Sequence, residues 1–167
     1  IVKDSGVKTF IIHARKGILK GLSPRQNRNV PPLNYKKVYA IKKDFPDLEI
    51  IINGGIKNID ESQNHLKSVD GVMLGRAAYD DPFMLSNVDS EIYSNKKIDI
   101  NRKELLSEYL NYVQVMTDNG YDPKIMLKHV FGLKKGEKDA KKFRMKVAEI
   151  MNSSGLDENK DNLLSMV

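Results

Sequence analysis

Two stretches of this chain decide the fold that we expect, LEIIINGGI at residues 48–56 and DGVMLGRAAYDDP at residues 70–82. In each, a short run of β-branched or apolar residues leads to glycine at the point where a polar side chain, Asn53 or Arg76, is presented. Glycine at a strand end lets the backbone approach a ligand closely and leaves main-chain amides pointing outward. Two consecutive loops of this kind are typical of the phosphate site of a (β/α)8 barrel. The pair therefore predicts a phosphate-bearing cofactor, although each loop alone also fits an ordinary tight turn.

Strand and helix patterns alternate through the first half of the chain. Strands are predicted at 7–12, 48–52 and 71–74, and helices at 35–45, at 59–69 and after Gly75, with a long polar loop at 17–34. This order is the pattern of parallel α/β architecture. Three strands cannot close a barrel that takes eight, so we expect the last three βα units of a TIM (β/α)8 barrel.

After residue 95 the pattern is helical only. Asn101, followed by Glu104, predicts a helix start, and further helices are expected at about 122–132, 137–151 and 158–166. The helix that starts at Asn101 has an apolar stripe of Leu105, Leu106, Tyr109, Leu110, Val113 and Met116. The second carries Ile125, Met126, Val130 and Phe131. We therefore predict an α/β domain at 1–95, followed by an all-α bundle at 96–167.

The bulk composition narrows the class of protein. The 167 residues are 40% hydrophobic and 30% charged, and no apolar run approaches the length of a bilayer span. No export signal is visible, which favours the cytosol or an organelle interior. Cysteine is absent, so the chain has no disulfide and no thiolate metal site. It begins at Ile1 within a running strand pattern, and we expect an upstream portion to be missing; a processed N-terminus is the alternative.

Positive charge is concentrated in two segments, although the whole chain carries a net charge of only +6. Residues 5–43 contain ten basic and no acidic side chains, and residues 134–146 contain seven basic and two acidic ones. Basic segments of this kind suggest a polyanion-binding surface, but they also fit a solvated face.

Several polar residues are candidates for ligand binding. His13 follows the first predicted strand, and its imidazole could donate a hydrogen bond to a cofactor. Asn53 could contact the polar edge of a cofactor, beside the backbone amides of Gly54 and Gly55. Gly75 and Arg76 at a helix start would form an anion site. His65 is expected on a solvated helix face, and no metal-binding motif is visible.

At this point the motifs carry a resemblance to a known family. The segments HARKGILKGLSPRQNRNVPPLNY (13–35), INGGI (52–56) and DGVMLGRAAYDDP (70–82) resemble tRNA-dihydrouridine synthases of the A subgroup. The segments KHVFGL (128–133) and AKKFR (140–144) resemble the C-terminal helical domain of that subgroup.

The resemblance implies an FMN-binding TIM barrel followed by a helical tRNA-binding domain. It implies reduction of D-loop uridines, about positions 20 and 20a of tRNA, with NADPH reloading the flavin. Carried over by position, it implies FMN contacts at His13, Asn53, Gly54, Gly55, Gly75 and Arg76. It likewise implies tRNA contacts at Arg25, Arg28, Lys141 and Arg144, which lie in the two basic segments.

The chain also departs from the family. The family's proton-donating cysteine and flavin-contacting lysine are expected upstream, so no catalytic residue is assigned here. Lys141 stands where the family usually has arginine, which replaces a bidentate contact by a point charge. Lys138 and Asp139 replace the family's usual Pro-Gly pair before Ala140.

Two other functions fit the same residues. The chain could be a noncatalytic RNA-binding module, or part of another FMN barrel that acts on a free pyrimidine. The basic loop argues against the second alternative. For the preferred function, the expected partners are tRNA and the missing N-terminal half of the barrel, with non-native dimerisation of the chain alone.

Overall fold

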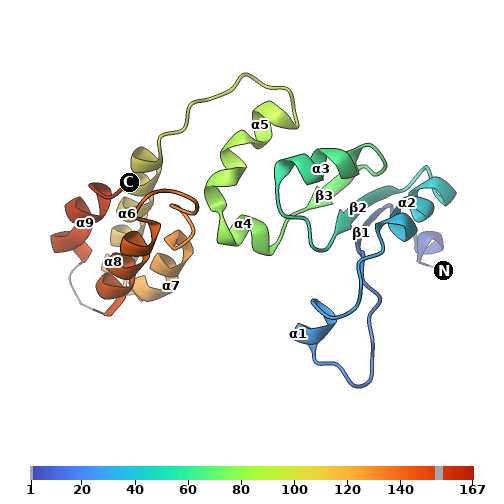
Figure 1. The fold of residues 1–167 in the computed structure, drawn as a ribbon, viewed down its shortest axis with the longest axis horizontal. Coiled ribbons are helices and arrows are strands. Elements are labelled where there is room, and N and C mark those ends of the chain that lie inside the picture. The colour runs from blue at the N-terminus through green and yellow to red at the C-terminus, as the bar shows by residue number, and fades with distance from the viewer. Residues whose placement is uncertain (1, 153–155) are drawn as a thin grey trace. The chain divides into compact units, whose positions relative to one another are not determined.

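The computed structural model describes residues 2–152 and 156–167. By its internal contacts the chain divides into two compact units, residues 1–77 and residues 78–167. Figure 1 shows the strands in the first part of the chain and the long helices α6, α8 and α9 in the last part.

The first unit is a parallel α/β unit. A 3-10 turn, η1 (Lys3–Ser5), precedes its sheet. Its further elements, in chain order, are β1 (Thr9–His13), α1 (Pro24–Asn27), α2 (Tyr35–Asp44), β2 (Glu49–Asn53), α3 (Ile59–Leu66) and β3 (Gly71–Met73). The sequence predicted every one of these strands and both of the longer helices to within two or three residues. Helix α1, within the long loop, was not predicted.

The three strands form one sheet in the order β1-β2-β3, and both pairings are parallel. Thr9 pairs with Glu49 at one end of the sheet, and His13 pairs with Asn53 at the other. Asn53 in turn pairs with Met73 of β3. The last residues of all three strands therefore lie in one row across the sheet.

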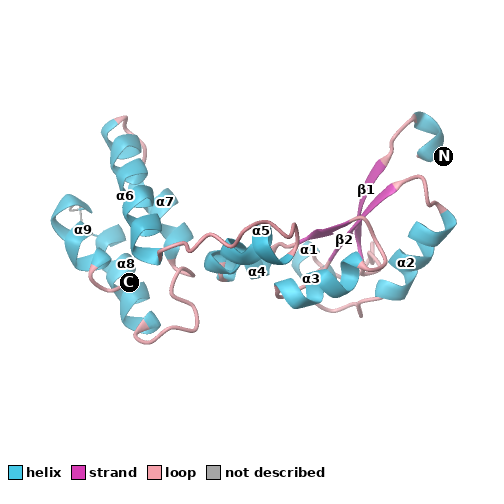
Figure 2. Cartoon of the chain, turned by 90° about the horizontal axis from the view of Figure 1, so that it is seen from above, coloured by secondary structure: helices cyan, strands magenta, loops and turns pink. Residues whose placement is uncertain are grey.

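Helices α2 and α3 cover one face of this sheet, and Figure 2 shows both on the same side of the strands. Ile50 and Ile52 point into that face and are fully buried. They pack with Val38 of α2 and with Leu48, Ile56 and Val69. Alternation along β2 thus produces the core of the unit, because successive strand side chains point to opposite faces.

The opposite face of the sheet is apolar but exposed. Ile11 is 57% exposed and Met73 is 42% exposed, although both lie in strands. In the described part of the chain no strand pairs with the outer edge of β1. An open edge beside an apolar face favours pairing with another chain.

We therefore expect the 167-residue chain to form dimers or larger assemblies when it is expressed alone. Light scattering over a range of concentrations measures this directly. Ile11→Lys should reduce the association, because it places a charge on the exposed face, whereas Leu19→Lys in the exposed loop should not. A monodisperse monomer of the unmodified chain at high concentration would contradict the expectation.

The second unit is helical. Helix α4 (Arg76–Asp80) leads into it, and its remaining elements are η2 (Pro82–Asn87), α5 (Val88–Glu91), α6 (Arg102–Asp118), α7 (Pro123–Leu127), η3 (Lys128–Val130), α8 (Ala140–Asn152) and α9 (Leu156–Leu164). Asn101 caps α6, as predicted, because its side chain accepts from the amides of Lys103 and Glu104. Helix α8 begins at Ala140 rather than at residue 137.

One hydrophobic core joins α6, α7, α8 and α9. It contains Leu110, Leu127, Phe143 and Leu163, all fully buried. Two residues of the predicted apolar stripes lie outside it: Leu105 is 40% exposed and Ile125 is 59% exposed. The prediction was wrong for both, because these two side chains point about 100° away from their neighbours Leu106 and Met126, which are buried in the core.

Packing places the division of the chain earlier than the predicted boundary at residues 95/96. A Cβ atom on Gly132 would lie 2.5 Å from the carbonyl oxygen of Asp80 and 2.9 Å from Pro82. Phe83 packs against the helical core, and the Arg102 guanidinium lies 3.7 Å from the centre of its ring. Residues 78–95 therefore belong by contact to the helical unit. None of the helices in the described residues is long and apolar enough to cross a membrane.

Candidate functional site

The carboxyl end of the sheet brings together two of the predicted site residues. His13 is the last residue of β1 and Asn53 is the last residue of β2, and they are partners in the strand register. The Asn53 side-chain amide donates to Met73 Sδ at 3.3 Å. Sulfur is a weak acceptor, so this amide retains most of its capacity to bind a polar ligand.

Gly54 and Gly55 are required by the fold itself. Their φ angles are +114° and +76°, which L-residues with side chains rarely adopt. A Cβ on Gly54 would lie 2.9 Å from the His13 imidazole, and a Cβ on Gly55 would lie 2.6 Å from Leu33. Internal packing thus accounts for both glycines, and their contact with a cofactor stays a prediction.

Gly75 differs from them, because a Cβ there would meet nothing within 4 Å. Its missing side chain leaves open space directly before Arg76. Helix α4 does begin at Arg76, as predicted, but it is five residues long. So short a helix has a small dipole, and the guanidinium rather than the helix start is the group that would attract an anion here.

Positive charge gathers around His13. The pKa of His13 is lowered first by burial and then by the positive charges of Arg15 and Arg76. The Arg15 amide donates to His13 Nδ1 at 3.1 Å, which makes Nδ1 an acceptor and places the proton of the neutral ring on Nε2. An anion between these groups would be stabilised by both guanidinium charges.

Arg15 is the site residue that sequence reasoning missed. Its Nε donates to the carbonyl oxygen of Pro31 at 2.8 Å. Its Nη1 is buried and has no hydrogen-bond partner among the described residues. A buried guanidinium N–H without a partner is unusual, because leaving such a donor unsatisfied is costly. Since Nη1 is inaccessible, Arg15 contributes positive charge to the site rather than an open donor. The signal was present in the sequence as a basic residue two positions after the strand-end histidine.

The long loop at residues 17–34, here called the basic loop, is ordered by its own side chains. Ser23 and Gln26 form a reciprocal capping box at the start of α1, with Pro24 in the first helical position. Helix α1 holds Arg25, and Arg28 follows directly; both side chains are exposed. The two predicted RNA contacts in this loop are therefore presented to solvent from one short helical turn.

The basic loop returns to the sheet through polar contacts. The Asn34 amide donates to the Ala14 carbonyl at 2.7 Å, and Arg15 forms an antiparallel bridge with Leu33. Arg76 Nη1 donates to Asn29 Oδ1 at 2.6 Å. The loop with the predicted RNA contacts is thus bonded to the arginine that was predicted to hold a phosphate.

Lys141 and Arg144 both lie on α8, and both are exposed. Three residues apart on a helix, they share one face, as predicted. Asp139, just before the helix, has φ +61°, the left-handed region that favours glycine. The Lys138-Asp139 pair therefore still provides a glycine-like conformation, and Asp139 also pairs with Lys142 at 2.9 Å.

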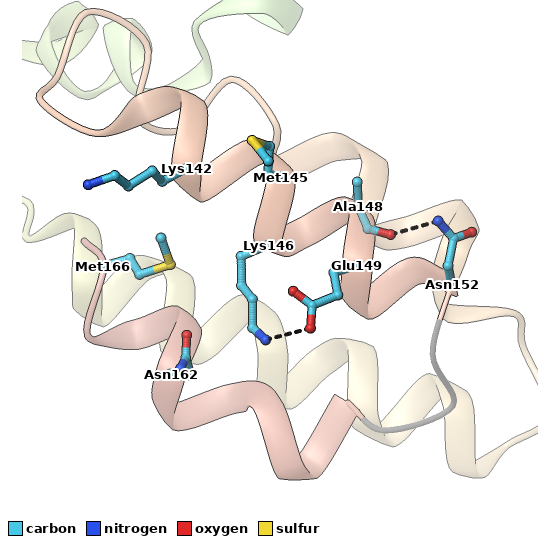
Figure 3. Close-up of a pocket in the computed structure, with 8 residues that line it drawn as sticks. All are labelled: Lys142, Met145, Lys146, Ala148, Glu149, Asn152, Asn162 and Met166. Carbon is cyan, nitrogen blue, oxygen red and sulfur yellow. Dashed lines mark hydrogen bonds and ion pairs between the residues drawn. The ribbon is translucent and has the colours of Figure 1, made fainter.

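A groove of about 540 Å³ lies between α8 and the C-terminal segment (Figure 3). Its lining residues are Lys142, Met145, Lys146, Ala148, Glu149, Asn152, Asn162 and Met166. Lys146 is paired with Glu149 at 3.0 Å across one side of it. Lys141 and Arg144 are not among the lining residues, and sequence reasoning did not single out this groove.

The expectation for His65 was wrong, because the side chain is buried rather than solvated. His65 Nδ1 lies 2.6 Å from the Tyr39 hydroxyl, and its ring packs edge-on against Tyr35 at 4.4 Å. The Tyr35 hydroxyl donates to the Gly54 carbonyl at 2.9 Å. His65 is therefore part of the packing behind the Asn53-Gly54-Gly55 loop, and burial lowers its pKa.

This burial predicts a loss of stability in mild acid. The folded-state pKa of His65 lies below its ordinary value of 6.5, so the unfolded chain takes up the proton first as the pH falls. The contribution is present above pH 6.5 and is lost as the pH falls toward the folded-state pKa. The thermal unfolding midpoint should therefore drop between about pH 7.5 and 5.5, and His65→Gln should reduce the drop. An equal drop in the unmodified protein and in His65→Gln would contradict the assignment of the effect to His65. The pKa of His13 is lowered as well, so the same measurement on His13→Gln shows how much of the drop comes from that histidine.

Three parallel strands thus carry polar and cationic groups at their carboxyl ends. The model of the dihydrouridine synthase (Dus) family matches residues 1–166. The chain belongs to this family.

Curated relatives give the same result. The chain is 43% identical over 143 residues to a tRNA-dihydrouridine(20/20a) synthase of Pseudomonas putida, which covers 86% of this chain and 43% of the relative. It is 42% identical over 149 residues to the protein of that name from Synechocystis (89% of this chain, 45% of the relative). It is 38% identical over 155 residues to that of Vibrio vulnificus (93% and 48%). The chain spans less than half the length of these relatives.

Within the described residues no group of three or more His, Asp or Glu side chains could hold a metal ion.

Proposed function

We propose that this chain supplies the cofactor-phosphate site and the RNA-binding segments of a tRNA-dihydrouridine synthase. The carrying observation is the cluster of His13, Arg15 and Arg76 at the carboxyl end of the sheet, where His13 pairs with Asn53 and accepts from the Arg15 amide. Family membership supplies the reaction class. By analogy with the named relatives, the substrate would be tRNA, and the product dihydrouridine at positions 20 and 20a.

The residues present fit FMN. The phosphate of FMN would lie between His13, Arg15 and Arg76, where Gly75 leaves open space. The Asn53 amide would contact the polar edge of the flavin, beside Gly54 and Gly55. When bound, FMN supplies the redox chemistry, with NADPH as its reductant, whereas the protein supplies orientation and charge.

The three parallel strands fit a part of a TIM barrel. In that fold the face opposite the helices is filled by side chains from the other strands. The exposed Ile11 and Met73 would then be interior residues, and β1 would pair with a strand from the N-terminal half of the barrel. The proposed whole is an FMN-binding barrel with a C-terminal helical domain, in the cytosol or an organelle interior.

Arg25 and Arg28 on the basic loop, with Lys141 and Arg144 on α8, would contact tRNA phosphates. All four are exposed, and each pair is presented from one helical segment. Exposed cations on ordered helical segments suit backbone contacts, which position a nucleic acid without reading its sequence.

Substitution of Arg76 tests the cofactor site. In the whole protein, Arg76→Ala should weaken FMN binding about ten- to a hundredfold, because charge-assisted bonds to phosphate contribute about 1.5–3 kcal/mol. Flavin fluorescence titration of the apoprotein measures the affinity. Lys67→Ala, which removes an exposed cation at the end of α3, should leave it unchanged. Unaltered flavin affinity in the Arg76 variant would show that Arg76 does not bind the phosphate.

A further inference from the structure

We propose that Asn29 is a positioning residue that ties Arg76 to the basic loop, so that anion binding at Arg76 and closure of the loop reinforce each other. The identity of the anion as the FMN phosphate rests on the proposed function. The tie itself is independent of that function, because it consists of contacts within this chain.

The central contact joins two segments that are far apart in the sequence. Arg76 Nη1 donates to Asn29 Oδ1 at 2.6 Å across a separation of 47 residues. A guanidinium carries five N–H donors in a rigid planar fork, so one bond to Asn29 fixes its orientation and leaves other donors for an anion. Asn29 thus orients the group that the proposed phosphate site needs.

Asn29 is in turn fixed to the segment that carries the predicted RNA contacts. Its amide donates to the carbonyl of Gln26 at 2.9 Å, directly after α1, and the amide of Val30 donates to the same carbonyl at 2.7 Å. Two residues later, the Pro31 carbonyl accepts from Arg15 Nε. A movement of Asn29 away from Arg76 therefore displaces the turn that presents Arg25 and Arg28.

Asn27 extends this connection to the first half of the basic loop. Its Oδ1 accepts from the Ile18 amide at 2.7 Å, and its Nδ2 donates to the Ile18 carbonyl at 2.8 Å. This pair of bonds holds the first part of the loop, at Ile18, against α1. The segment at Ile18, α1 and residues 29–31 consequently form one hydrogen-bonded structure, which is joined to Arg76 through Asn29.

Coupling between the two sites follows from thermodynamic reciprocity. If closure of the loop orients Arg76 for a phosphate, then a phosphate on Arg76 must favour closure by the same factor. Both partners in the contact are exposed, so the effect should be modest, on the order of three- to tenfold. FMN, which has a phosphate, should show the effect, and riboflavin, which lacks one, should not.

Limited trypsin digestion of the whole protein reports loop opening, because trypsin can cut after Lys20, Arg25 and Arg28. Asn29→Ala should speed cleavage at these bonds about three- to tenfold and weaken FMN binding by a similar factor. Riboflavin affinity should stay the same. Bound FMN should slow the cleavage in the unmodified protein but not in the Asn29→Ala variant. Asn64→Ala, at an exposed asparagine whose Oδ1 accepts from Lys67 Nζ at 2.8 Å, is the matched control and should change neither measurement.

Asn29→Asp separates positioning from a purely structural role. A carboxylate keeps the bond to Arg76, so cleavage should remain as slow as in the unmodified protein. The same carboxylate neutralises the guanidinium and repels a phosphate, so FMN affinity should fall at least as far as in Asn29→Ala. A purely structural residue would change loop closure and FMN affinity together in both variants.

Two outcomes would overturn the proposal in different ways. Wild-type cleavage rates in both Asn29→Ala and Arg76→Ala would show that the contact does not hold the loop, whatever the flavin does. Faster cleavage in Arg76→Ala with unchanged FMN affinity would overturn the coupling, and with it the assignment of Arg76 to the cofactor phosphate in the proposed function.

Discussion

Incubated with FMN, NADPH and unmodified tRNA, the 167-residue chain is expected to form no dihydrouridine. The proposed reaction requires a proton donor beside the uracil ring. The resemblance to the family implies a cysteine in that role, and these 167 residues contain none. In the proposed barrel of eight strands, the three strands of this chain would also supply only one side of the pocket.

Mass spectrometry of nucleosides from the digested tRNA measures the product. The Pseudomonas putida relative, assayed under the same conditions, is the positive control. Product from it shows that the reductant and the tRNA are competent. Product from this chain above the level of an enzyme-free reaction would contradict the expectation and would require a different proton donor within these residues.

Simultaneous replacement of Arg25, Arg28, Lys141 and Arg144 by alanine should lower the affinity of the whole protein for tRNA on the order of a hundredfold. Exposed contacts to charged groups contribute roughly 0.5–1 kcal/mol each, and four of them give about 2–4 kcal/mol. The salt dependence of binding should flatten as well, by about 0.7–0.9 in logarithmic slope for each phosphate that the variant no longer neutralises.

A charge-matched variant makes this test specific. Alanine at Lys57, Lys67, Lys97 and Lys124 removes the same four positive charges, which lowers the formal net charge of +6 to +2, as in the first variant. Filter-binding titrations at several salt concentrations should show a much smaller decrease in affinity for this control. If the affinity of the two variants falls equally, the basic segments act only through overall charge, and the four assigned contacts are wrong.

The sheet unit could be predicted well because its signals are local. Short β-branched runs such as Glu49–Asn53, bounded by glycine and proline, give the strands and their parallel order. The row of His13 and Asn53 at the carboxyl end then follows from topology, since parallel strands end at the same edge.

Other features depend on contacts between distant residues and were missed. His65 has polar neighbours along its helix, and only the tertiary packing of Tyr35 and Tyr39 shows that it is buried. Arg15 becomes a site residue because Pro31 holds its Nε and its positive charge lies close enough to lower the pKa of His13. Helix α1 was missed for a different reason. Its signal, the capping box of Ser23 and Gln26, is local, but residues 17–34 were predicted to be a polar loop.

The tight contact at Gly132 has a practical consequence for exchanging helical domains between relatives. Because Asp80 and Pro82 press on this glycine, and Phe83 is stacked on Arg102, the segment after the Gly75-Arg76 motif belongs with the helices in any exchange. A chimera joined at residue 95 would take Asp80, Pro82 and Phe83 from one parent. It would take Gly132 and Arg102, which these residues contact, from the other parent. A junction at residues 77/78, the boundary between the two compact units, keeps these partners together in one parent.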